Sequence, residues 1–253
     1  MIASYFSICI SGRPETREKH ALLIANNLNT KAQDNLRRSL AHARLLEAEL
    51  QKMNFNVVKH ANVFNEERIL KNVKDFSRSY ANGDIVFVYF SCLAHQVNGI
   101  NYLIPSNDES INTVQDVEAF GADFGQIIDR LTESQRDTAF IFVFNCCRAS
   151  TIQAGGLHSI NLPADRKIFI QYPCAVDDTT KDDLFMIHLL RDIDRKNIDI
   201  SEIFDEISED VFNKRHQQSR PHSVNQLSAR DIIFLNQVDI PIRMYRKSCV
   251  FFS

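Results

Sequence analysis

The chain has 253 residues, of which 44% are hydrophobic and 24% charged, as in one globular α/β domain with a sizeable core. Its formal net charge of -3 leaves no basic surplus for binding nucleic acid or an anionic membrane. No apolar run approaches the roughly 20 residues of a membrane span. Residues 1–10 are apolar but lack the positive leader of a signal peptide. We expect residues 1–18 to form an N-terminal arm, with a signal peptide as the alternative.

The cysteines and glycines argue against a zinc site and a glycine-rich phosphate loop. None of the six cysteines forms a CxxC pair, so their spacing indicates no zinc site. Reduced thiols in a cytoplasmic protein explain them most simply. With only 7 glycines, the chain also gives little support for a glycine-rich phosphate loop. The histidines are scattered without the spacing of metal ligands.

Short apolar runs alternate along the chain with stretches whose apolar residues recur at helical spacing, as Leu36, Leu40 and Ala43 do. Two runs, 84–91 and 140–144, are almost continuously apolar, which is typical of central parallel strands. In chain order, the patterns predict a strand at 21–25, a helix at 34–53, a strand at 56–59, a helix at 65–80, a strand at 84–91, a hairpin over 96–105 that turns at Asn98-Gly99, a helix at 120–131, strands at 140–144 and 166–172, helices at 184–193 and 200–212, and a last strand at 231–235.

This alternation predicts a mostly parallel sheet with helices on both faces. In such sheets the ligand crevice lies outside the carboxyl ends of the strands. Two strand ends therefore matter most: the one at Ser91 and the one at Asn145, which runs into Cys146-Cys147-Arg148.

These strand ends, with segments 46–57, 88–91, 96–105, 142–148 and 198–204, resemble the caspase, metacaspase and paracaspase family of cysteine peptidases. The resemblance implies a caspase-like three-layer α/β sandwich, whose mostly parallel central sheet has about six strands with helices on both faces. It divides the chain into a p20-like half (19–148), a mobile loop (149–164), a p10-like half (165–235) and a C-terminal tail packed on the domain (236–253).

In that family the first strand end carries Ser-Gly-His-Gly, and its His is the general base. The second carries Asp-x-Cys-Arg, and its Cys attacks the scissile carbonyl. The imidazole promotes thiolate formation and then protonates the leaving amine, while backbone N–H groups hold the oxyanion. Matched without a gap, Cys147 falls on the nucleophile and Arg148 on the Arg after it, and the backbones of Ala94 and Cys147 on the oxyanion hole.

The same match reveals three departures. Leu93 stands where the family has its catalytic His, and leucine can neither accept nor donate a proton. Ala94 replaces a glycine, which adds a Cβ beside the oxyanion N–H. Asn145 replaces the Asp that helps metacaspases and paracaspases bind a basic P1 side chain. Asp177 and Asp178 could supply an acid to this pocket, or could belong to a solvated loop before the next helix.

His95 is the candidate for a displaced base. In an extended chain it points to the same side as Leu93, but roughly 6–7 Å further on, whereas a dyad needs contact within about 3 Å. His95 could act only if the loop were reshaped; otherwise it is a partly exposed loop histidine.

Two hypotheses follow. We favour a catalytically impaired pseudopeptidase with a regulatory or binding role; the alternative is an active cysteine endopeptidase that uses Cys147 with His95. The expected partner is a peptide or protein, bound as substrate or otherwise, with neither nucleic acid nor membrane. A homodimer through the sheet edge near 232–235, or a heterodimer with an active homologue, is a further hypothesis. We expect no cofactor or metal, although calcium activation, known for some metacaspases, stays open.

Overall fold

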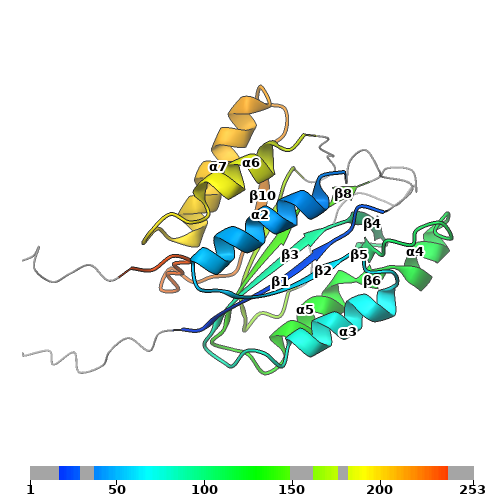
Figure 1. Ribbon diagram of the computed structural model, residues 1–253, viewed down its shortest axis with the longest axis horizontal. Coiled ribbons are helices and arrows are strands. Elements are labelled where there is room, and N and C mark those ends of the chain that lie inside the picture. Colours follow the sequence, from blue (N-terminus) through cyan, green and yellow to red (C-terminus); the bar gives the residue numbers. More distant parts are fainter. Residues whose placement is uncertain (1–16, 29–36, 149–161, 176–181, 239–253) are drawn as a thin grey trace, which may run out of the picture.

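The central sheet is built from the apolar runs of the sequence. A computed structural model describes residues 17–28, 37–148, 162–175 and 182–238 (Figure 1). Every residue of the two middle strands is buried, which explains their near-continuous apolar sequences. The six-stranded sheet has the order β10-β9-β7-β3-β1-β2, with β1 Lys19–Ala25, β2 Asn56–Ala61, β3 Ile85–Ser91, β7 Ala139–Phe144, β9 Lys167–Tyr172 and β10 His222–Asn225. All neighbouring pairs are parallel except β9 and β10.

Helices cover both faces of this sheet (Figure 1). On one face lie α2 Ser39–Lys52, α6 Leu184–Asp192 and α7 Ile200–Lys214, whose buried residues share a core with Ala21 and Leu23 of β1. On the other lie α3 Glu66–Phe76 and α5 Phe124–Thr132, which share a second core with Leu22 and Ile24. The alternation along β1 feeds both cores. The expected three-layer caspase-like sandwich, with a mostly parallel sheet of about six strands, is confirmed.

A second, smaller sheet lies beyond the carboxyl end of β3. Its order is β6-β5-β4-β8, with β4 Leu93–Val97, β5 Ile100–Ile104, β6 Ala122–Asp123 and β8 Cys147–Arg148. The expected hairpin is β4 and β5, which pair antiparallel. Its turn residues have φ values of 51° at Asn98 and 81° at Gly99, which explains the Asn-Gly pair at this position.

Side-chain caps set where several helices begin. Asn65 accepts the N–H of Arg68 before α3, Asp123 accepts the N–H groups of Gly125 and Gln126 before α5, and Asp199 accepts that of Ser201 before α7. The predicted helix over 120–131 therefore begins only at Phe124. A short helix that was not predicted, α4 Val114–Phe120, precedes it and has a capping box at Thr113.

Gly121 separates α4 from β6. A Cβ at this position would lie 2.6 Å from the carbonyl oxygen of Val117 and 2.9 Å from Cβ of Tyr102. The close approach of α4 to β5 therefore needs a glycine here.

The predicted last strand over 231–235 is wrong. Within the part of the chain that the structure describes, their only β-pairing is the isolated bridge between Asp199 and Phe234. Ile233 and Leu235 are buried against the α2, α6 and α7 side of the sheet, so their apolar alternation reflects contact with helices. The outermost strand is instead β10, which is short and polar and therefore gave no strand pattern.

Residues 1–16, 149–161 and 239–253 lie outside the described residues, and with them most of the predicted arm, loop and tail. Within the described ranges, no helix is long and apolar enough to cross a membrane.

Substitution of Phe124 tests the core beneath the small sheet. Its ring is 1% exposed and lies edge-on to Phe144, with ring centroids 4.1 Å apart. We expect Phe124→Ala to lower the free energy of unfolding by about 3–5 kcal/mol, because it leaves a cavity. Phe120→Ala is the matched control, since that ring is 50% exposed, and it should change the free energy by less than about 0.5 kcal/mol. Urea unfolding measures both; equal losses would contradict this assignment of the core.

Candidate active site

The two strand ends singled out in the sequence lie side by side. β3 and β7 pair in parallel up to Phe90 and Phe144. Two residues follow Phe90 and two follow Phe144 before β4 and β8 continue the pairing, with Leu93 opposite Cys147 and Ala94 opposite Arg148. The backbone of the candidate nucleophile is thus paired with the residue that occupies the family's base position.

Cys92 and Cys146, the residues just before β4 and β8, are in contact. The Sγ atoms of Cys92 and Cys146 lie 3.4 Å apart, and the Cys146 thiol donates to the carbonyl oxygen of Phe90 at 3.6 Å. Cys92 is 2% exposed and Cys146 is 7% exposed, and both belong to the core on the α3 and α5 side. Both side chains therefore pack in this core.

Leu93 lies in an apolar environment. Its side chain is 1% exposed and shares a cluster on the small sheet with Val97, Tyr102, Ile104, Ile111 and Val117. Val117 belongs to α4, so this unpredicted helix helps to cover the base position. No group in this cluster besides the Tyr102 hydroxyl could exchange a proton.

His95 lies two residues further along β4, opposite Tyr102 of β5. Because residues 93–97 form a regular strand, the two-residue step displaces His95 from Leu93 by about 6–7 Å along the strand. The side chain is only 6% exposed, so the prediction of a partly exposed loop histidine is wrong. The reason is that the hairpin begins at residue 93, earlier than the predicted 96, and takes His95 into a strand.

A small cavity adjoins this region. Its volume is about 20 Å³, and it is bounded by Ala94, His95 and Gln96 of β4 together with Phe144, Cys146 and Tyr172, among others. That space suffices for about one water molecule.

Asn145 is directed at the sheet. Its amide nitrogen donates to the hydroxyl of Tyr89 at 3.3 Å, and its backbone N–H donates to Phe90 at 2.8 Å. Tyr89 is fully buried, and that burial raises the pKa of its phenol far above the ordinary value. The phenol therefore stays neutral, and Asn145 is held by a neutral hydrogen bond. Sequence analysis missed Tyr89, although its position two residues before the end of β3 was a usable signal.

Part of the predicted site is beyond what the structure describes. For Cys147 and Arg148 it describes the backbone pairing of β8. Asp177 and Asp178 lie outside the described residues. The predicted roles of Cys147, His95, Ala94, Asn145, Asp177 and Asp178 therefore stay predictions.

Comparisons with known proteins agree with this architecture. The caspase domain family matches residues 18–231. Among solved structures, the Drosophila initiator caspase Dronc is similar, with a TM-score of 0.62 and 16% sequence identity over 86% of this chain and 83% of that chain. No curated protein is significantly similar in sequence. Because the family match spans most of the chain, the chain belongs to the caspase-domain family.

Proposed function

We propose that this caspase-family domain is catalytically impaired and acts by binding or regulating another protein. The observation that carries the proposal is the burial of Leu93, at 1% exposure, in an apolar cluster directly opposite the backbone of Cys147. A cysteine–histidine dyad needs an imidazole within hydrogen-bond reach of the thiol, which leucine cannot provide.

The chemistry of the thiol supports at most weak activity. Loss of a general base typically lowers the rate by a factor on the order of 10²–10⁴. A thiol can retain part of its reactivity, because a few per cent is thiolate at neutral pH. Efficient peptide hydrolysis would need another group within about 3 Å of the Cys147 sulfur.

The position of Asn145 also argues against strong selection of a basic P1 residue. Its side chain is uncharged and is engaged with the Tyr89 hydroxyl. A neutral amide offers a lysine or arginine side chain less electrostatic attraction than a carboxylate does.

The second candidate function is a cysteine endopeptidase that uses His95 as a displaced base. Cys147 and Arg148 stand in the family's order, and His95 lies on the strand that pairs with β8. Against it, His95 is buried and lies two residues beyond the Leu93–Cys147 pair.

A panel of peptides with Arg, Lys or Asp at P1 separates the two candidates. We expect the wild type, Cys147→Ala and His95→Ala to hydrolyse all three at the same background rate, as measured by release of a fluorescent leaving group. An active caspase in the same assay serves as the positive control. Loss of a measurable wild-type rate in both variants would overturn the impaired-peptidase proposal and support the second candidate.

Replacement of the base position tests the observation on which the proposal rests. We expect Leu93→His with Ala94→Gly to raise peptide turnover by about 10²–10⁴-fold, which is what a general base typically contributes. The variant should also be less stable, because an imidazole replaces leucine in an apolar cluster.

Two controls accompany this variant. Ala94→Gly alone should leave turnover at background, and adding Cys147→Ala to the double variant should abolish the gain. A folded double variant that shows no gain would contradict the view that the missing base limits the reaction.

We further propose that two copies of the domain pair through β10. This strand is one edge of the six-stranded sheet and contains neither lysine nor proline, the residues that commonly protect an edge. The opposite edge, β2, carries Lys59, which is paired with Glu47. We expect a dimer that dissociates on dilution in light scattering; a monomer at high concentration would contradict this proposal.

A further inference from the structure

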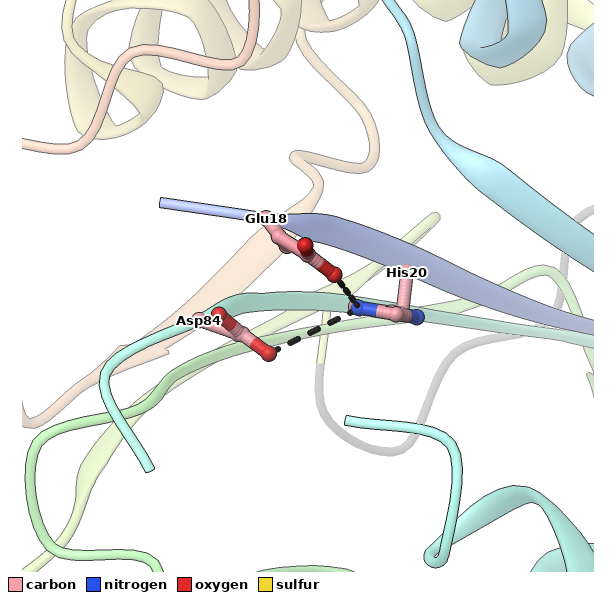
Figure 2. A group of neighbouring side chains, drawn as sticks. All are labelled: Glu18, His20 and Asp84. Carbon is pink, nitrogen blue, oxygen red and sulfur yellow. Dashed lines mark ion pairs between the residues drawn. The ribbon is translucent and has the colours of Figure 1, made fainter. Parts of the chain in front are cut away.

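Three side chains that can ligate a metal meet at the end of the sheet opposite to the candidate active site. They are Glu18 and His20, at the beginning of β1, and Asp84, just before β3 (Figure 2). One ligand atom from each lies within 4.8 Å of the other two. Since β3 is seven residues long, this cluster is about 20 Å or more from the strand ends discussed above.

The parallel register of β1 and β3 brings the three together. Lys19 pairs with Ile85 and His20 with Val86, so Glu18 and Asp84 are the residues that precede the first pair. Glu18 and His20 are two residues apart and point to the same face of the strand. The sequence showed no metal-ligand spacing because the ligands come from two strands separated by more than 60 residues.

The imidazole of His20 is buried and is directed at both carboxylates. Its Nε2 lies 3.5 Å from an oxygen of Glu18 and 3.5 Å from an oxygen of Asp84 (Figure 2). The residue is 5% exposed, yet Nε2 makes no hydrogen bond. A buried polar atom without a partner costs free energy. Nε2 is therefore an unpartnered ligand atom that faces one oxygen of each carboxylate.

We propose that the cluster of Glu18, His20 and Asp84 binds a divalent transition metal of the Zn²⁺ class. Zn²⁺ takes histidine nitrogen and carboxylate oxygen at about 2.0–2.2 Å in tetrahedral geometry, which separates neighbouring ligand atoms by about 3.4 Å. Both Nε2–oxygen distances of 3.5 Å agree with that separation. A mixed nitrogen and oxygen set favours Zn²⁺ over Ca²⁺ or Mg²⁺, which prefer oxygen alone.

The surroundings hold two of the ligands in place. Oδ2 of Asp84 accepts the N–H of Ala81 at 2.8 Å, an outer-shell bond of the kind that orients metal ligands. The backbone carbonyl of Glu18 accepts the N–H of Ile85 at 2.9 Å, which ties the two strand beginnings together. The Glu18 side chain is 73% exposed and leaves the cluster open to an ion from solvent.

A second cluster of the same kind differs in its charge, although His188 Nδ1 there also makes no hydrogen bond. His188, Asp192 and Asp210 also come close together, but Arg191 forms ion pairs with both aspartates. Its guanidinium supplies the positive charge there. Among the described residues, neither Glu18 nor Asp84 has an ion pair with lysine or arginine, so no such side chain balances these two carboxylates.

Titration of the full chain with Zn²⁺ alone tests the proposal. All proteins carry Cys147→Ala, which removes the candidate nucleophile as a competing ligand. We expect calorimetry to find one Zn²⁺ per chain, an affinity at least tenfold weaker in Glu18→Gln, and no binding in His20→Ala. Glu67→Gln, which alters another exposed carboxylate of the same chain, is the matched control and should bind as the parent does.

Glu18→Gln keeps the test decisive if His20→Ala fails to fold, because Glu18 is exposed. Cobalt absorption identifies the ligand type: a nitrogen and oxygen set gives no thiolate charge-transfer band. The absence of Zn²⁺ binding, or equal affinity in Glu18→Gln and Glu67→Gln, would overturn the proposal. A thiolate band would overturn it as well, since the metal would then lie on cysteine. None of these outcomes depends on whether the domain hydrolyses peptides.

Discussion

The register of one parallel pairing determines which residues can meet at the candidate active site. β3 and β7 are paired with a constant offset, and β4 and β8 resume with the same offset of 54 residues, which the Cys92–Cys146 contact also has. Leu93 is therefore the residue opposite Cys147. His95 could take that place only if β4 slipped by two residues, which would undo its pairing with β5 and separate the two thiols. The register of the central sheet thus fixes the pairing of Leu93 with Cys147.

Two side chains at positions of the family's active site, Leu93 and Asn145, contribute to packing and hydrogen bonding inside the domain. Burying a leucine contributes about 1.5–3 kcal/mol to stability, and Leu93 obtains that contribution in its apolar cluster. Asn145 likewise donates a hydrogen bond to the buried hydroxyl of Tyr89, which itself donates to Sδ of Met186. A proton-transfer group at 93 or a carboxylate at 145 would have to be held in these same surroundings. The domain has the architecture of the family, and Leu93 and Asn145 contribute to its packing and hydrogen bonding.

Local sequence could reveal features whose physical cause is local. The continuous apolar runs of β3 and β7 and the Asn98-Gly99 turn were predictable because burial on both faces and positive φ values leave their own marks. β10 was not, because a short polar edge strand is specified by its neighbour. The alternation of Ile233 and Leu235 led to the wrong prediction of a strand, because contact with helices can also select alternating apolar residues. The hydrogen bond from Asn145 to Tyr89 and the grouping of Glu18 with Asp84 depend on register between distant segments, which no single stretch of sequence contains.

The difference between the two partners of β4 has a consequence for how the chain folds. β4 and β5 are joined by a two-residue turn, so this hairpin can close within microseconds. The pairing of β4 with β8 spans 54 residues and includes the loop-closure entropy of the intervening chain. It becomes favourable only once β3 and β7 are aligned beside it. The hairpin therefore has the lower loop-closure cost, and the pairing that brings the backbone of Cys147 beside Leu93 depends on the long-range alignment of β3 with β7.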